Sequence, residues 1–404
     1  LAFSSDAALI RDAIDRKAGR KADASFADTD SFTGTAGALA SRPLARAFLA
    51  SGFLQGILRS LPPEPDPQRR MVQEAIQAYG EAVRGSAAAL VVADGKVQLQ
   101  LVQAFRPGTL ARKDASITAL LAPDAGPEPG PDAPDPLVVP ASAFAAASLR
   151  VDVPALYGLL AGLAPEQNRA QLAKLEAIAS ALLLGQDLRG RILPALGPRV
   201  VAYLDAPRST ESTPGSLFPF VATIEIRDKE PREGGGAGAA AALDNALKAV
   251  LAALSLDENR VPATAQVVTR DGVTSLDVPY PFAYSVDAAR GRLTVGNAPS
   301  AVARRLEAEG GEEGAGRFRS FQAAAFPDCS SFACVDLSAA ASLAEQHKAR
   351  LVALTARRQR RKPADAARDL ESILEAARLF DAAYLCGRID VDADLAEGRL
   401  GLIP

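Results

Sequence analysis

The sequence predicts an α+β protein in which duplicated modules of antiparallel β-hairpins form a sheet covered by alanine-rich helices. The first observation behind this prediction is a repeated strand-to-helix motif. Cys329–Ser342 is typical of a short buried strand that runs directly into a helix, with Ser338 as its N-cap. Ala147–Leu160 has the same pattern, and Asp152 of the first copy aligns with Asp336 of the second.

The second observation is the series of hairpin signals between these motifs. Alternating apolar strands flank Asp94-Gly95 and Asp271-Gly272, and Asp-Gly is typical of the tight type I′ hairpin turn. The third observation is a repeated strand: Ala-Tyr-Leu at Ala202–Leu204 recurs at Ala383–Leu385. We therefore expect residues 142–205 and 328–392 to superpose as strand–helix–helix–strand units.

The first hairpin also predicts which of its sides is buried. Val97, Leu99 and Leu101 alternate with Gln98 and Gln100 along its second strand. In an antiparallel sheet this alternation is typical of one face on the core and one in water. We expect the leucine side to be buried and the glutamine side to be wet.

The remaining segments are predicted from periodicity and from breaker residues. Thr35–Leu61 has apolar residues at helical spacing, Phe48 and Phe53 among them, so it is predicted to be mostly helical. Pro123–Pro136 is rich in proline and is predicted to be a loop. Further helices are expected from Asp66-Pro67 to Arg84, from Pro165, over Ala239–Leu254, after the second motif to Thr355, and over Pro363–Phe380.

These elements suggest three regions. Residues 1–140 would hold the remainder of a first α+β module with a helical segment and a hairpin. Residues 141–327 would form a central α+β module, and residues 328–404 a partial repeat of the strand–helix–helix–strand unit.

Composition narrows the classes of function. The net charge of −3 over 404 residues gives no reason to expect a nucleic-acid partner. The three cysteines are too few for a disulfide framework, so Cys334 and Cys386, both on expected strands, are interpreted as buried small apolar residues rather than as a bonded pair. No apolar run is long enough to cross a bilayer.

One segment resembles a known family. Asp187–Gly197 carries the pattern Asp-Leu, then Ile-Leu-Pro, then Leu-Gly, and strand, helix, hairpins, strand and helix follow it as far as about Leu337. This arrangement resembles a bacterial family described only as a domain of unknown function. The resemblance implies export, often with a lipid anchor or one N-terminal helix as a tether. Because the chain begins at Leu1, we expect such a tether to lie upstream of it.

Residues that suggest chemistry have simpler structural interpretations. His347 is the only histidine and is interpreted as facing solvent, which disfavours a catalytic triad or a zinc site. Glu233–Gly238 lacks the lysine and the spacing of a phosphate-binding loop and is interpreted as a surface insertion. Asp152 and Asp336 are interpreted as helix caps rather than an acid–base pair. We therefore expect no enzyme activity, no cofactor and no metal site.

The expected function is recognition by a surface. We expect an exported, periplasmic scaffold or accessory subunit of a larger cell-envelope assembly, with other envelope proteins and an anionic membrane surface as partners and no small-molecule ligand. The alternative is a carrier whose curved, half-open sheet shelters a lipid or another apolar ligand, which a cavity of several hundred Å³ would favour. The residues that could contact partners are Phe48, Phe53, Arg357, Arg358, Arg360 and Arg361. The basic run Arg357–Lys362 is interpreted first as a solvated linker between two helices, with contact to anionic lipid head groups or an acidic partner as the alternative.

Overall fold

A computed structural model gives the fold of the chain. It describes residues 30–39, 42–50, 67–93, 96–110, 139–162, 166–207, 218–227, 238–256, 261–308 except 263 and 279, and 331–404, with the scattered residues 11, 14–15, 18–20, 55–56, 60, 317–318, 320–321, 323 and 329. The predicted loop Pro123–Pro136, residues 233–237 of the predicted insertion and Phe53 lie outside these residues.

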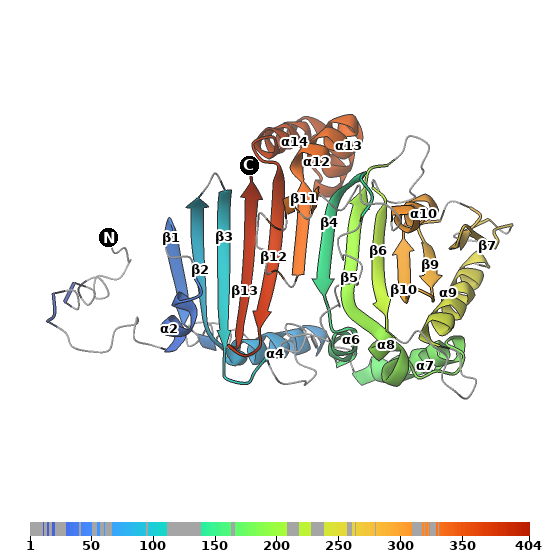
Figure 1. Cartoon of the computed structure of the whole chain (residues 1–404), viewed down its shortest axis with the longest axis horizontal. Helices are drawn as coiled ribbons and strands as arrows, with labels where there is room; N and C mark the ends of the chain where they lie inside the picture. The colour runs from blue at the N-terminus through green and yellow to red at the C-terminus, as the bar shows by residue number, and fades with distance from the viewer. Residues whose placement is uncertain are drawn as a thin grey trace.

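The fold is α+β and is built on one antiparallel sheet of thirteen strands (Figure 1). The strand order is β1-β2-β3-β13-β12-β11-β4-β5-β6-β10-β9-β8-β7, so strands from the beginning and the end of the chain are neighbours. All three predicted regions contribute strands to this sheet. The strands are Ala45–Ala50 (β1), Val83–Ala93 (β2), Lys96–Phe105 (β3), Ala143–Arg150 (β4), Leu196–Asp205 (β5), Phe220–Ile226 (β6), Val267–Arg270 (β7), Val273–Leu276 (β8), Ala283–Asp287 (β9), Arg292–Gly296 (β10), Ser331–Asp336 (β11), Ala382–Asp390 (β12) and Leu395–Ile403 (β13).

Helices connect the strands at both of their ends. In Figure 1, α4 and α6 lie at the lower ends of the strands and α12, α13 and α14 lie at the upper ends. The helices are Asp30–Ala36 (α2), Pro67–Ala82 (α4), Val153–Gly162 (α6), Glu166–Leu182 (α7), the π-helical turn Leu188–Ile192 (η2), Leu193–Ala195 (α8), Ala239–Ser255 (α9), Pro299–Ala308 (α10), Leu337–Gln346 (α12), Lys348–Gln359 (α13) and Pro363–Ala377 (α14).

One face of the sheet, which we call the covered face, is packed along most of its width. Leu39, just beyond α2, packs on Ala87, Ala89 and Val102 at the β1 end of the sheet. At the other end, Val302 of α10 packs on β8 and β9. In the centre, Phe318 packs with Tyr203, Phe332 and Tyr384. These contacts make the covered face the main hydrophobic core of the protein.

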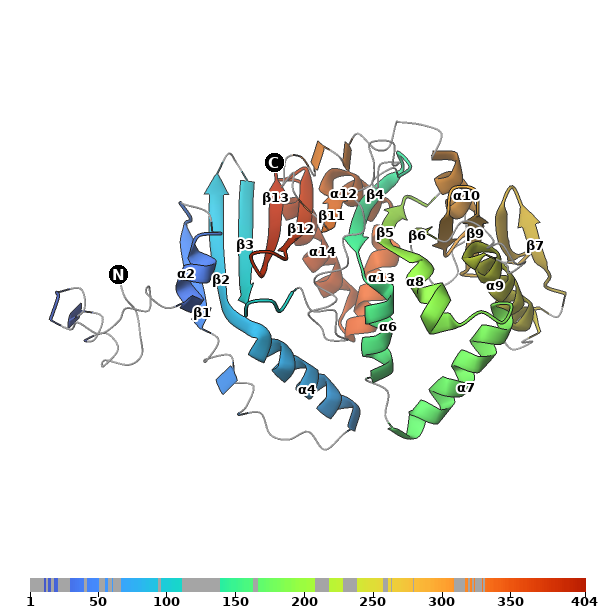
Figure 2. The same cartoon turned by 60° about the horizontal axis from the view of Figure 1, so that its bottom comes forward.

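The opposite face is packed over the strands from β6 to β8 and at one end of β3, β12 and β13, where Tyr79 of α4 packs with Phe105, Ile389 and Ala396. Over β6 to β8, α9, together with part of α7, covers Ile226, Leu276, Tyr284 and Leu293, and the Tyr284 hydroxyl donates to the carbonyl oxygen of Asp244 at 3.2 Å. Figure 2 shows α9 on the same side of the sheet as α4, α6, α7, α13 and α14. These six helices therefore extend from the sheet toward this second face, whereas α10 lies on the covered face.

Two helix assignments differ from the sequence-based expectation. Thr35–Leu61 is not one helical region, because α2 ends at Ala36 and residues 45–50 form β1, which pairs with β2. Pairing with a neighbouring strand outweighs the helical spacing of the apolar residues. The N-cap of α12 is Asp336 rather than Ser338: its carboxylate accepts from the amide of Ala339 at 2.7 Å.

The two segments expected to be equivalent share much of their element order. Residues 142–205 contain β4, α6, α7, a short helical turn and β5, whereas residues 328–392 contain β11, three helices and β12. β4 and β11 pair with each other in the centre of the sheet. Asp152 caps α6 as Asp336 caps α12, since its carboxylate accepts from the amide of Ala155 at 2.9 Å.

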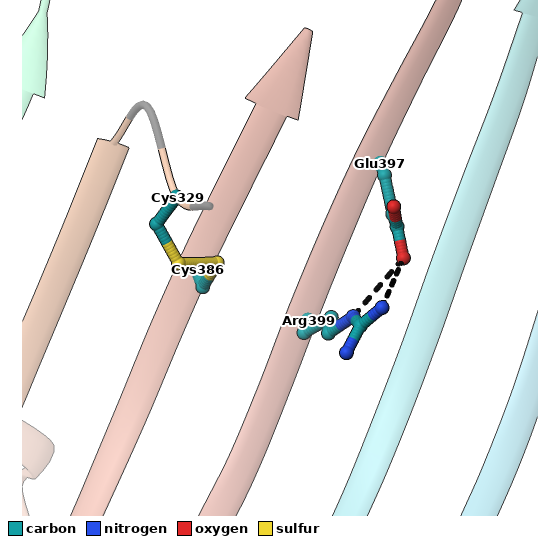
Figure 3. Close-up of a disulfide and its surroundings, with 4 residues drawn as sticks. All are labelled: Cys329, Cys386, Glu397 and Arg399. Carbon is teal, nitrogen blue, oxygen red and sulfur yellow. Dashed lines mark hydrogen bonds and ion pairs between the residues drawn. A yellow bond between two sulfur atoms is a disulfide. The ribbon is translucent and has the colours of Figure 1, made fainter. Parts of the chain in front are cut away.

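The cysteines also differ from the expectation. Cys386 is not a free thiol and does not pair with Cys334; it forms a disulfide with Cys329, with the two Cα atoms 5.8 Å apart (Figure 3). Cys334 is the free, buried thiol. The bond joins Cys329, which lies just before β11, to Cys386 of β12 on the covered face. Strand alternation alone does not reveal it, because Cys329 lies outside any strand.

We expect the double substitution Cys329→Ala and Cys386→Ala to lower the free energy of unfolding by about 2–4 kcal/mol, because the disulfide closes a segment with a separation of 57 residues in the unfolded chain. Guanidinium denaturation with and without a reductant measures this. The reductant should weaken the parent protein and leave the double variant unchanged. A parent protein that is indifferent to reductant would contradict a stabilising role.

Candidate functional site

The candidate site is the uncovered part of the second face, which we call the open face. It extends over the eight neighbouring strands from β2 to β6. The strand register places one side chain of each strand in a continuous row across this face. The first row is Leu90, Leu99, Leu400, Leu385, Ala333, Ala147, Ala202 and Ala222.

A second row runs beside the first, two residues further along each strand. It is Val92, Val97, Leu402, Ala383, Val335, Ala145, Leu204 and Phe220. Neither row contains a charged or hydrogen-bonding side chain. Six large apolar side chains of this face are between 38% and 55% exposed: Val92, Leu101, Leu149, Phe220, Leu385 and Leu400.

The centre of the open face is hollowed. Five alanines form the floor of this hollow, and their small methyl groups leave an open depression that larger neighbouring side chains border. We call it the alanine hollow; its volume is about 440 Å³, within the usual range for small-molecule sites. The floor residues are Ala145, Ala147, Ala202, Ala333 and Ala383, and the rim includes Leu204, Phe220, Leu385 and Leu400.

A cluster of polar side chains from β3 and β13 lies on the covered face. Gln100 is only 3% exposed, and its amide donates to the carbonyl oxygen of Ala38 at 2.8 Å and to Glu397 Oε1 at 2.6 Å. Arg399 donates to the same carboxylate oxygen from Nε at 3.0 Å and from Nη2 at 2.7 Å (Figure 3). The expectation that the leucine side of this hairpin is buried and the glutamine side wet is therefore wrong at Gln100 and Leu101.

A second buried polar group lies on the covered face at β5. Arg304 Nε of α10 donates to Asp205 Oδ2 at 2.7 Å, and both side chains are almost completely buried. Burial, reinforced by the charge of Asp205, raises the pKa of the neighbouring Tyr203 phenol. Such a pair is costly to expose or to break, so it holds this face of β5 toward the core.

Helices frame the open face at both ends of its strands. In Figure 2, α4 and α6 stand at one end and α13 and α14 at the other, all on the side of the open face. The junction of α6 with α7 is held by Glu176, which accepts from the Tyr157 hydroxyl at 2.5 Å and from Arg189 Nη2 at 2.5 Å. The hydrogen bonds from Arg189 and Tyr157 lower the pKa of the Glu176 carboxyl. We call the open face, together with the helices at the two ends of its strands, the trough.

The residues singled out in the sequence do not converge on one site. Phe48 lies on β1, half-buried on the covered face, with its ring centroid 4.4 Å from that of Phe32. His347 is half-buried between α12 and α13 rather than facing solvent, and its ring centroid is 6.3 Å from that of Phe218. The arginines Arg357, Arg358, Arg360 and Arg361 are exposed at the turn between α13 and α14.

Sequence reasoning missed the open face itself. Its signal was present in strands whose two faces are both apolar, such as AFAAASLR of β4 and SFACVD of β11. In an antiparallel sheet such strands are unusual unless helices cover both faces.

No family model, curated protein or solved structure matches this chain. Within the described residues, no helix is long and apolar enough to span a membrane, and no group of three or more histidine, cysteine or acidic side chains is arranged to hold a metal ion.

Substitutions on the two faces should differ in their effect on stability. Leu385→Gln changes an exposed side chain, so we expect the free energy of unfolding to change by no more than about 0.5 kcal/mol. Gln100→Leu leaves the buried acceptor at Ala38 without its donor and should cost about 1–3 kcal/mol. Urea denaturation of the two variants measures this. The reverse order would show that the leucine side is the buried one.

The thiol of Cys334 should be inert in the folded protein. Burial, together with the nearby charge of Asp336, raises its pKa to about 12, so almost no thiolate exists at pH 8. We expect Ellman's reagent to label no thiol in the native protein and one thiol per chain in guanidinium. Rapid labelling of the native protein would contradict the burial of this side chain.

Proposed function

We propose that the protein binds an elongated apolar ligand of the acyl-chain class in the trough formed by the open face. The observation that carries this proposal is the pair of apolar rows, sixteen side chains across eight strands, with the alanine hollow at their centre. This is the carrier alternative that the sequence left open, and a cavity of this size is the feature named as favouring it.

The energetics of the open face support a bound apolar group. Large contiguous apolar patches on a protein surface mark sites that are covered by a ligand, a membrane or a partner. Covering one fully exposed leucine or phenylalanine side chain contributes roughly 1.5–3 kcal/mol. Leu385, Leu400 and Phe220 are about half exposed, so an occupant that covers them gains a substantial part of that amount from each.

The chemistry of the hollow supports an alkyl chain in particular. Among the side chains that face it, none is charged and none is a hydrogen-bond donor or acceptor; Tyr203 and Tyr384 belong to the same strands but point to the covered face. A ligand that inserted a polar group here would lose hydrogen bonds to water without replacing them. Because helices stand at both ends of the strands, the trough suits a narrow ligand better than it suits a broad, flat protein surface.

We infer that the protein works outside the cytoplasm, in the periplasm or an equivalent compartment. The disulfide between Cys329 and Cys386 supports this, because such bonds persist in oxidising compartments. A membrane tether upstream of Leu1 would agree with the family resemblance. The proposed function is binding and transfer, and it requires no catalytic step.

Recognition of envelope proteins remains the second candidate function. Phe48 gives it little support, since its ring packs against Phe32 and the covered face. The exposed arginines Arg357, Arg358, Arg360 and Arg361 support it better, as an acidic partner would match them. In that case the protein would act as a scaffold or accessory subunit of an envelope complex.

We also infer that the sheet arose from two related units. The strand neighbours support this: β5 and β12 flank the central pair β4–β11, and Tyr203 and Tyr384 occupy matching positions on either side of the Ala146–Cys334 pair. The caps Asp152 and Asp336 support it as well. On this view both units contribute half of the alanine hollow.

The binding proposal is tested by filling the hollow. Ala147 and Ala333 are direct neighbours on its floor, so Ala147→Leu with Ala333→Leu should displace an alkyl chain without adding a polar group. We expect the affinity for a fluorescent fatty acid to fall at least about tenfold, since a lost 1.4 kcal/mol is a factor of ten. Titration of the probe at constant protein concentration measures this.

The matched control is Ala88→Leu with Ala47→Leu, which makes two alanine-to-leucine changes on the paired strands β2 and β1, away from the hollow. It should leave the affinity within about twofold of the parent value, and circular dichroism should show both variants folded. Equal affinities in the parent and the filled variant would contradict the proposal. A stable dimer of the probe-free protein that Leu385→Gln with Leu400→Gln abolishes would instead assign the open face to a second copy.

A further inference from the structure

We propose that the turn between α13 and α14 docks the protein on an anionic bilayer, with the open face toward the leaflet. The docking surface, which we call the basic tip, consists of Arg357, Arg358, Arg360, Arg361 and Lys362. This inference rests on the proposed function for its purpose, because a protein that takes up or delivers an acyl chain must meet a membrane.

The position of the basic tip supports a membrane contact. The amide of Asp381, just after α14, donates to the carbonyl oxygen of Ile403 at 2.7 Å, so the C-terminal end of α14 is attached to the sheet. The helix has 15 residues and, at 1.5 Å per residue, is about 22 Å long, so its first residue, Pro363, lies about that far from the end that is attached to the sheet. In Figure 2 the α13–α14 pair extends on the side of the open face. The basic tip therefore projects beyond the sheet on the side from which a ligand would enter.

The charge of the basic tip is largely uncompensated by its neighbours. Arg361 pairs with Asp369 at 2.5 Å, but Arg357, Arg358, Arg360 and Lys362 make no ion pair with any residue that the structure describes. Nearer the sheet, Lys348 pairs with Glu371 at 2.8 Å and Arg378 with Glu345 at 3.2 Å, and Arg350 is the exposed arginine there without an ion pair among the described residues. Positive charge is thus concentrated at the end farthest from the sheet.

The shape of the turn holds these cations outward. Arg360 has a left-handed backbone with φ of 53°, a conformation for which glycine is the usual residue at a helix end. The amide of Arg361 donates to the carbonyl oxygen of Ala356 at 3.0 Å, which closes the end of α13. An arginine therefore occupies a position where glycine would relieve backbone strain. A function of the Arg360 charge explains the presence of arginine at this position better than a purely connecting role of the turn does.

An apolar side chain accompanies the cations. Leu354 is 44% exposed and precedes Arg357 and Arg358 by three and four residues, so the three side chains lie on adjacent parts of one helix surface. Arginine side chains can extend their charged ends to lipid head groups while their stems lie along apolar surface. This combination suits the interface of an anionic leaflet better than it suits bulk water.

The experiment compares binding to vesicles before and after charge reversal. Each arginine near an anionic leaflet contributes roughly fivefold to binding, so Arg357→Glu with Arg358→Glu and Arg360→Glu should weaken co-sedimentation with phosphatidylcholine–phosphatidylglycerol vesicles by about 100-fold or more. Vesicles of phosphatidylcholine alone should bind neither protein strongly. Raising the salt to about 1 M, where the screening length is about 3 Å, should reduce binding of the parent protein.

The matched control reverses three exposed arginines elsewhere, Arg106→Glu, Arg227→Glu and Arg270→Glu, and so has the same net charge. If the control loses as much binding as the tip variant, net charge rather than the basic tip causes it, and the proposal is overturned. Unchanged binding of the tip variant overturns it too. A further variant, Arg360→Gly, relieves the backbone strain and should still lose about fivefold in vesicle binding, which separates the charge from folding.

A soluble probe separates this inference from the proposed function. The tip variant should bind the fluorescent fatty acid in vesicle-free buffer as the parent does, whereas the hollow-filling variant should lose the probe but keep vesicle binding. Loss of vesicle binding with the probe retained supports the basic tip. Vesicle binding that needs the tip while no variant binds the probe would support docking and reject the acyl-chain site.

Discussion

The arrangement of this protein depends on the polar side chains that are buried on one face of the sheet. Hydrogen bonds among Gln100, Glu397 and Arg399 join β3 to β13. On the same face, Asp205 of β5 pairs with Arg304 of α10. Exposing or breaking these contacts would leave buried polar groups unsatisfied, so they fix which face of each strand is turned to the core. Because side chains alternate along a strand, this choice also determines that the leucines and alanines face outward.

An apolar face that is left open carries a risk, and the structure limits it. Exposed apolar surface on a sheet promotes association with other chains. Here the helices that connect the strands stand at both ends of the open face, and α9 closes it beyond β6. A broad partner surface meets these helices before it reaches the strands, whereas a narrow chain does not. The same geometry that protects the face therefore selects the shape of what can occupy it.

Some of this could be predicted from the sequence. The α+β class, the hairpins and the caps Asp152 and Asp336 follow from local patterns, because turns and caps depend on neighbouring residues. The open face does not, since alternation separates two faces without saying which one is covered. Gln100 is buried only because Glu397 and the carbonyl of Ala38 meet it from distant parts of the chain. Likewise, Phe48 lies on a strand rather than on the expected helix because β1 pairs with β2, which is distant in the sequence.

The last segment of the chain unites the two surfaces to which we assign function. Residues 331–404 supply β11, β12 and β13, with Ala333, Ala383, Leu385 and Leu400 around the alanine hollow, and also α13 and α14 with the basic tip. The disulfide joins Cys329, just before this segment, to Cys386 within it. Under our proposals, α14 and the junction at Asp381, whose amide donates to the carbonyl oxygen of Ile403, would connect the tip to the strands of the hollow. A ligand that passes between bilayer and hollow would meet both surfaces in a fixed relation.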